Sequence, residues 1–321
     1  GDVYKRQLLD EGSFTEIDEN VVSEENPDGE AVITGSGTIH GRPVYVFSED
    51  FSIMGGSLGE IVAKKILRVM DLALDARAPI VGIKDSGGAR IQEGISSLYG
   101  YAQIFKKNVE ASGKIPQISV VVGPSAGGAV YSPALTDFIF QVQGIGQLYV
   151  TGPGVVKTVT GEDVSYEELG GVEAHGTKSG VSHQICENEE QAFEEVRYLL
   201  SFLPQSSDQK PPVFITEDDN ERSVEMLDSL IPENRNHPYD MNDVINNIVD
   251  DGEQYPVQSN YALNIITSFS RISGNTVGII ANQPLDFAGV LDIKASEKAA
   301  RFVRFCDCLL YTSDAADEVL G

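Results

Sequence analysis

Basic residues are scarce in this 321-residue chain. It has 23 Lys and Arg against 49 Asp and Glu, so its formal net charge is -26. A surface this negative repels the phosphates of nucleic acids and of anionic membranes, so we expect neither as a partner. Cysteine is rare too, and three cysteines at irregular spacing are too few for a disulfide framework in a chain of this length. The 41% of hydrophobic residues nevertheless indicates a globular protein rather than a disordered acidic tail.

Long apolar runs and metal-binding spacings are also missing. No segment approaches the ~20 apolar residues of a membrane span, and no basic region followed by an apolar core opens the chain, which predicts a cytoplasmic protein. The C-x-C pair of Cys306 and Cys308 has no second pair beside it. The four histidines form no H-E-x-x-H or similar spacing, so we expect no metal site.

The hydrophobic pattern alternates between strands and helices. Residues 31–39 and 43–47 predict two strands joined by a tight turn. A capping box of Ser57 and Glu60 is predicted to begin a helix that runs to Arg77. Next come two units of the same kind, each a buried strand, a Gly-Gly turn and a helical pattern, with strands at 79–83 and 116–122, which predicts an α/β fold. Further strands at 138–142 and 147–151 and a helix at 187–203 follow.

Proline marks the next change along the chain. Residues 204–260 carry six prolines among acidic and amide residues, which predicts a linker with short helices and a domain boundary near its start. A strand at 276–281 and a helix at 296–305 then open a second unit.

The two Gly-Gly turns are the candidate functional motifs. Gly87 and Gly88 form the first turn, and Gly127 and Gly128 form the second. Glycines between a strand and a helix leave backbone N–H groups without side-chain cover, beside the partial positive charge of a helix N-terminus. Such a turn can bind a phosphate or stabilise an oxyanion such as a thioester enolate. A single turn is better explained by tight packing alone, but two on successive units favour a function.

Residues 123–127 also match G-x-S-x-G, the pattern of the nucleophile elbow in α/β hydrolases. Ser125 would then need an acid and a histidine later in the chain, and His175, His183 and His237 are available. None of these histidines has a context that identifies it as the base. A serine hydrolase using Ser125 is therefore the alternative from another functional class.

Several longer motifs carry a family resemblance. They are FSIMGGSLGE (51–60), DSGGARIQEG (85–94), GPSAGGAVYSP (123–133), the segment from TGP to ELGG (151–171), PYDM (238–241), ANQP (281–284) and ASEKAARFVRFCD (295–307). In this order they resemble the carboxyltransferase β subunit of biotin-dependent acyl-CoA carboxylases, nearest to propionyl-CoA carboxylase. The resemblance runs from about Leu8 to Asp307. It implies a crotonase-like (ClpP/crotonase) α/β fold, a β-β-α superhelix, with one complete domain at 8–204 and, at 205–307, a linker and the beginning of a second crotonase-like domain.

The resemblance also implies a reaction. Carboxyltransferases of this kind move CO2 from carboxybiotin, held on a separate carrier chain, to the α carbon of a short acyl-CoA, here most simply propionyl-CoA. The carboxyltransferase subunit of a methylmalonyl-CoA decarboxylase or transcarboxylase is the alternative within the family. The implied partners are acyl-CoA, a biotin carboxylase and biotin carboxyl carrier subunit, and further copies of the chain in a hexamer.

By position, the resemblance assigns two groups of site residues. The amides expected to hold the enolate oxygen belong to Gly87, Gly88, Ala89, Gly127 and Gly128. The residues expected to bind substrate are Gly55, Gly56, Ser57, Arg90, Ser125 and Ala126. Residues 1–7 and 308–321 depart from the family and resemble translated adaptor sequence, so we expect them to be non-native ends and the biotin side of the site to be incomplete.

Overall fold

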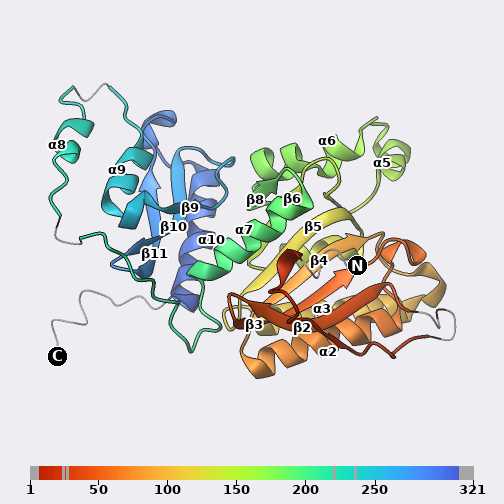
Figure 1. Cartoon of the computed structure of the whole chain (residues 1–321). Helices are drawn as coiled ribbons and strands as arrows, with labels where there is room; N and C mark the ends of the chain where they lie inside the picture. Colours follow the sequence, from red (N-terminus) through yellow and green to blue (C-terminus); the bar gives the residue numbers. More distant parts are fainter. Residues whose placement is uncertain (1–6, 24–25, 27–28, 220–221, 235–236, 311–321) are drawn as a thin grey trace. The chain divides into compact units, whose positions relative to one another are not determined.

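The computed structural model describes residues 7–23, 26, 29–219, 222–234 and 237–310 (Figure 1). Its chain divides into two compact units between Leu200 and Ser201. The domain limits expected from the sequence, 8–204 and 205–307, stay predictions. None of the helices in the described ranges is long and apolar enough to cross a bilayer.

The first unit is built on an eight-stranded sheet. The strands follow the spatial order β1-β2-β3-β4-β5-β6-β8, and β7 pairs with the end of β5. Pairing is antiparallel from β1 to β3 and parallel from β3 to β8. The strands are β1 (Thr15–Ile17), β2 (Val32–Ile39), β3 (Arg42–Glu49), β4 (Ile80–Ser86), β5 (Gln117–Ala126), β6 (Phe138–Val142), β7 (Gln147–Tyr149) and β8 (Gln184–Cys186).

The sequence explains both kinds of pairing. β2 and β3 are joined by His40 and Gly41, which both have positive φ, at 52° and 72°, as a two-residue hairpin turn requires. β4 and β5 are almost continuously buried, as parallel strands covered on both faces must be. Ser86 pairs with Ser125, so the carboxyl ends of β4 and β5 lie level with one another.

Helices cover the first unit's sheet and link its strands. α2 packs against β2, β3 and α3 (Figure 1). The apolar side chains of α2 and α3 share one core with Val32, Phe47 and Ile80. The helices are α2 (Glu60–Ala76), α3 (Ile95–Ala111), α4 (Gly128–Ala134), α5 (Pro153–Thr160), α6 (Tyr166–Gly170) and α7 (Glu189–Phe202), with short turns η1 (Met54–Gly56), η2 (Ile91–Glu93) and η3 (Ala174–Lys178).

The predicted capping box of α2 is wrong. The N-cap is Gly59, which has no side chain that could cap the helix. The N–H of Glu60 instead donates to Glu93 Oε2 at 2.5 Å, a carboxylate from 33 residues further along the chain. Ser57 is turned toward Arg90, whose Nε donates to its Oγ at 3.3 Å. A tertiary partner has therefore replaced the local cap.

The second unit contains a small antiparallel sheet in the order β11-β10-β9. α10 packs against β10 and β11, and the rings of Phe269 and Phe302 lie 5.0 Å apart. Lys298 of α10 is buried and donates to the carbonyl oxygens of Tyr261, Ala262 and Ile265. The elements are α8 (Met226–Leu230), α9 (Met241–Ile248), η4 (Asp250–Gly252), β9 (Gln254–Pro256), β10 (Ile265–Ile272), β11 (Asn275–Asn282), η5 (Phe287–Gly289) and α10 (Ile293–Leu309).

The expected strand at 276–281 and helix at 296–305 are both confirmed within longer elements. The suspected non-native ends lie mostly outside the described residues. Two residues of the suspected C-terminal end that the structure does describe, Cys308 and Leu309, complete the last turn of α10.

Candidate functional site

The first glycine turn is hydrogen-bonded to the loop that precedes α2. Gly87 N–H donates to Gly55 O at 2.8 Å, and Ser86 Oγ donates to Gly56 O at 2.6 Å. Gly88 N–H donates to Ser86 Oγ at 3.2 Å. The amides of Gly87 and Gly88 are therefore already occupied, although the sequence predicted them as oxyanion donors.

Ala89 differs from its neighbours in the turn. It forms a parallel bridge with Leu58, in which Leu58 N–H donates to Gly88 O at 2.9 Å and Arg90 N–H donates to Leu58 O at 3.0 Å. In this bond pattern the middle residue directs its own N–H away from the partner strand. Within the described part of the chain, the Ala89 N–H has no acceptor.

The second glycine turn joins β5 to α4. Gly127, with φ at 56°, is the N-cap of the helix, and its N–H donates to Tyr149 O at 3.2 Å. Gly128 is the first helical residue, and such a position has no partner inside its helix. Over the described ranges its N–H has no acceptor elsewhere. Each turn thus presents one unpaired amide.

Close contacts explain why these positions are glycine. A Cβ on Gly88, where φ is 105°, would lie 2.8 Å from Ala126 O, so the first turn directly abuts the second. A Cβ on Gly128 would lie 2.6 Å from the ring of Tyr101. A side chain at Gly128 would therefore strike the core before it filled the space in front of the amides. A Cβ on Gly56 would lie 2.1 Å from Asp85 O.

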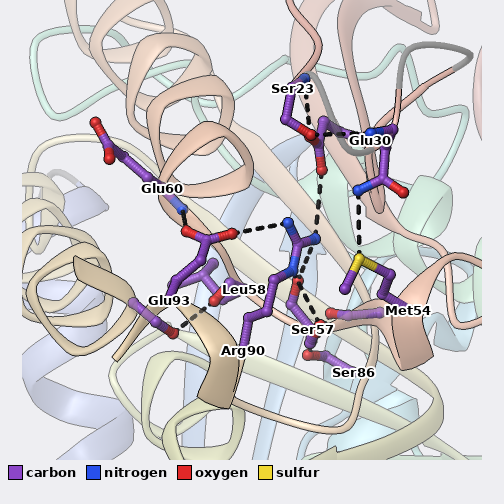
Figure 2. A network of polar contacts seen from close by, with 12 residues as sticks. Ser23, Glu30, Met54, Ser57, Leu58, Glu60, Ser86, Arg90 and Glu93 are labelled. Carbon is purple, nitrogen blue, oxygen red and sulfur yellow. Dashed lines mark hydrogen bonds and ion pairs between the residues drawn. The ribbon is translucent and has the colours of Figure 1, made fainter. Parts of the chain in front are cut away.

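Arg90, expected to meet a substrate anion, is buried in an ionic network (Figure 2). Its Nη1 lies 2.9 Å from Glu93 Oε1, and its Nη2 lies 3.3 Å from Glu30 Oε2 and 3.2 Å from Ser57 O. The side chains of both Arg90 and Glu30 are at most 1% exposed. The guanidinium therefore holds protein segments together, and its assignment to substrate binding stays a prediction.

A second acidic group lies at the end of β4. Glu49 and Lys84 form a buried ion pair at 2.8 Å, and the other carboxylate oxygen of Glu49 accepts the N–H of Asp85 at 3.0 Å. Burial, and then repulsion from Glu49, raise the pKa of the half-buried Asp85 to about 6. A Cβ on Gly123 would lie 1.9 Å from Asp85 Oδ1, so this carboxyl group touches β5 just before the second turn.

Ser125 lies inside β5, and its side chain is fully buried. Its Oγ has no hydrogen-bond partner among the described residues. His175 Nε2 lies 2.7 Å from Leu148 O, and His183 Nδ1 accepts the N–H of Ile139 at 3.1 Å. A nucleophile must be reachable and paired with a base, so this geometry disfavours the serine hydrolase.

The structure therefore brings the predicted turn residues together and separates their roles. Gly55, Gly56, Ser57 and Ala126 pack around the turns. Sequence reasoning missed Asp85, Glu30, Glu93 and Tyr101; of these, only Glu93 had a local signal, its spacing three residues after Arg90 on one turn of helix. No cluster of three metal-ligating side chains occurs in the described ranges.

A comparison with protein families identifies the chain. The sequence model of the family described as carboxyl transferase domain matches residues 5–310. The chain belongs to this carboxyl transferase family. The predicted resemblance and crotonase-like fold are thereby confirmed.

Curated relatives are identical to the chain at about half of the aligned positions. The propionyl-CoA carboxylase beta chain of Roseobacter denitrificans is 54% identical over 308 residues, which is 94% of this chain and 60% of the relative. The methylmalonyl-CoA decarboxylase subunit alpha of Veillonella parvula is 55% identical over 310 residues, covering 94% of this chain and 61% of the relative. The chain thus spans about 60% of the length of these relatives.

A solved carboxyl transferase structure matches the whole chain. The transcarboxylase 12S structure with methylmalonyl-coenzyme A and methylmalonic acid bound has a TM-score of 0.92 at 42% identity. It covers 100% of this chain, which covers 66% of that protein. Its description names a hexamer assembly and substrate binding to a multienzyme core.

Proposed function

We propose that this chain is the acyl-CoA side of a biotin-dependent carboxyltransferase of the propionyl-CoA carboxylase type. The observation that carries the proposal is the pair of abutting turns, each with one unpaired amide, at Ala89 and Gly128. An oxyanion bound there would accept two N–H donors from rigid backbone, the arrangement that stabilises a thioester enolate.

The substrate proposed is the pair propionyl-CoA and methylmalonyl-CoA. The relatives are named for propionyl-CoA carboxylation and for methylmalonyl-CoA decarboxylation, and the solved neighbour holds methylmalonyl-CoA. Between them the three names mention two thioesters that differ by one carboxyl group. They support this substrate class, whereas the direction of reaction differs among them, so a decarboxylase or transcarboxylase subunit remains the second candidate.

The proposed mechanism uses main-chain groups. When the α proton leaves, the electrons of the C–H bond move onto the thioester oxygen, and the N–H groups of Ala89 and Gly128 would bind that charge. The α carbon of the enolate then forms a bond to the carboxyl carbon. Carboxybiotin, presented by a separate carrier chain, would supply the CO2 by cleavage of its N–C bond, and the ureido nitrogen freed in this way would take up the α proton. The two amides fit the thioester oxygen, and no described residue is assigned to the biotin ring.

The proposed partners follow from the same family. They are a biotin carboxylase and carrier subunit and further copies of this chain, since the solved relative assembles as a hexamer. Light scattering on the purified chain measures its own association. A mass of six copies would agree with the relative, whereas a monomer would count against oligomerisation through the residues present here.

Binding of an enolate mimic tests the proposed function directly. The probe is a nitroalkyl-CoA in its nitronate form, compared by calorimetry with propyl-CoA, which has no negative oxygen. Two N–H donors to a charged acceptor, each worth about 1.5 kcal/mol or more, predict a preference of about 100-fold or more for the nitronate.

Replacing Ala89 by lactic acid exchanges only its backbone N–H for an ester oxygen. This change should reduce the preference about tenfold, because one donor is lost. The same replacement at Ala76, on the exposed end of α2, is the control and should leave it unchanged. Equal affinity of the unmodified chain for both ligands would refute the proposed function.

A further inference from the structure

The network around Arg90 surrounds one of the two unpaired amides. Arg90 follows Ala89 directly, and its side chain returns to Ser57, the residue before Leu58 (Figure 2). Leu58 is the bridge partner of Ala89. Backbone bonds and guanidinium bonds therefore fasten the same two segments together, one on each side of the Ala89 N–H.

Glu93 extends the network to a helix. One of its oxygens accepts Arg90 Nη1, and the other accepts the N–H of Glu60 at the start of α2. Glu30 brings in a third segment, because its second oxygen accepts the N–H of Ser23 at 3.1 Å. The orientation of the turn is thus tied both to α2 and to the chain before β2.

Stability alone is a poor explanation for this arrangement. A buried ion pair loses the hydration of both charges, so well-packed apolar residues of similar volume often give equal or greater stability. What ionic groups supply in addition is directional bonding, which fixes one arrangement of the segments they join. Here the arrangement fixed is that of the Ala89 amide.

We infer that Arg90 is a positioning residue that acts with Glu93 to hold the Ala89 N–H at the oxyanion site. The inference rests on the proposed function. Of the three ionic residues, Glu93 is the one best suited to substitution, because its side chain is 25% exposed whereas those of Arg90 and Glu30 are almost completely buried. Removing the charge of Glu93 leaves Arg90 paired with Glu30, so the buried guanidinium keeps a counterion.

The test is Glu93→Gln in the full 321-residue chain, with the nitronate and propyl-CoA ligands. Gln has one acceptor oxygen in place of two, so either Arg90 or the N–H of Glu60 loses its partner. We expect the preference for the nitronate to fall about tenfold while propyl-CoA binding changes less than about twofold. Glu60→Gln is the matched control, since Glu60 is exposed and its side chain pairs with Lys64.

Hydrogen exchange provides a second measurement without ligand. If Glu93 positions the turn, the N–H groups of Leu58 and Arg90, whose hydrogen bonds flank Ala89, should exchange faster in Glu93→Gln, while Ile104 in the core of α3 keeps its protection. Faster exchange throughout the unit would indicate a general loss of stability and would overturn the positioning role. Glu93→Asp keeps the charge but shortens the reach, and it carries the same test where the Gln variant does not fold.

The outcomes separate the two proposals. A wild-type chain without nitronate preference refutes the proposed function. A wild-type chain with the preference, and a Glu93→Gln variant that retains all of it, overturns the positioning inference alone. Equal losses of nitronate and propyl-CoA binding would also overturn it, because a purely structural role weakens both.

Discussion

Asp85 is expected to destabilise the folded chain when it ionises. Its pKa is raised from 3.8 to about 6, first by burial and then by the charge of Glu49. Below pH 3.8, both the folded and the unfolded chain hold the proton. Between pH 3.8 and about 6 only the unfolded chain releases it, so the free energy of unfolding falls over this interval. Above about pH 6 the loss is complete and constant.

The size of this loss follows from the pKa difference. At 1.36 kcal/mol for each pH unit, the step from 3.8 to about 6 corresponds to about 3 kcal/mol. Asp85 is only half-buried, so solvent screening reduces this value, and we expect about 1.5 kcal/mol. Asp85→Asn imitates the protonated acid, which removes the loss. The free energy of unfolding of Asp85→Asn minus that of wild type should therefore be about 1.5 kcal/mol larger at pH 8 than at pH 4.

Urea denaturation of wild type and Asp85→Asn at several pH values between 4 and 8 measures this difference. Asp75→Asn makes the same chemical change on an exposed position of α2 and should shift stability by less than about 0.5 kcal/mol at every pH. A stability difference that does not grow between pH 4 and pH 6 would refute the reasoning. An Asp85→Asn variant that is less stable than wild type at pH 8 but not at pH 4 would also refute the reasoning.

Three further substitutions test the packing. Gly56→Ala places a Cβ 2.1 Å from a carbonyl oxygen and should lower the free energy of unfolding by about 3 kcal/mol in urea, whereas Gly55→Ala, with the same φ of 64° but no atom nearer than 4.0 Å, should lower it by about 1 kcal/mol. Ser125→Ala removes an unpaired buried hydroxyl and should change stability by less than about 1 kcal/mol, and labelling of Ser125 by a fluorophosphonate would instead revive the hydrolase. Lys298→Met leaves three carbonyl groups without their donor, so it should lower the free energy of unfolding by about 2 kcal/mol and lower the melting temperature clearly. The exposed Lys294→Met should change the melting temperature little, and equal effects of the two substitutions would contradict this role of Lys298.

Hydrophobic periodicity predicted the central elements of the fold. β4, β5 and their helices were found because buried parallel strands are apolar throughout and end in glycine. β10 was missed because Thr267, Ser268 and Ser270 interrupt its apolar pattern, although all three are buried. Burial of these hydroxyls depends on packing from distant parts of the chain, which a local pattern does not contain.

The candidate site was predicted at the level of the turns and not of the single amide. Sequence spacing placed Gly87, Gly88 and Ala89 in one motif, but which N–H is unpaired depends on the loop at Gly55 and Leu58, some 30 residues earlier. The capping box failed for the same reason, since Glu93 reaches α2 from a distant position. Contacts between segments remote in sequence decide both outcomes.

Both proposed donors are main-chain groups, and this has a consequence for how the site tolerates mutation. An amide hydrogen is present whatever the side chain, so no exchange of residue type except to proline removes it. The limit at Gly128 is instead the volume behind the backbone, where Tyr101 leaves no room for a Cβ, and Gly88 is limited both by Ala126 O and by its φ of 105°. Saturation mutagenesis of Gly128 should therefore rank variants by side-chain size and not by charge or polarity, whereas every substitution at Gly88 should be unfavourable.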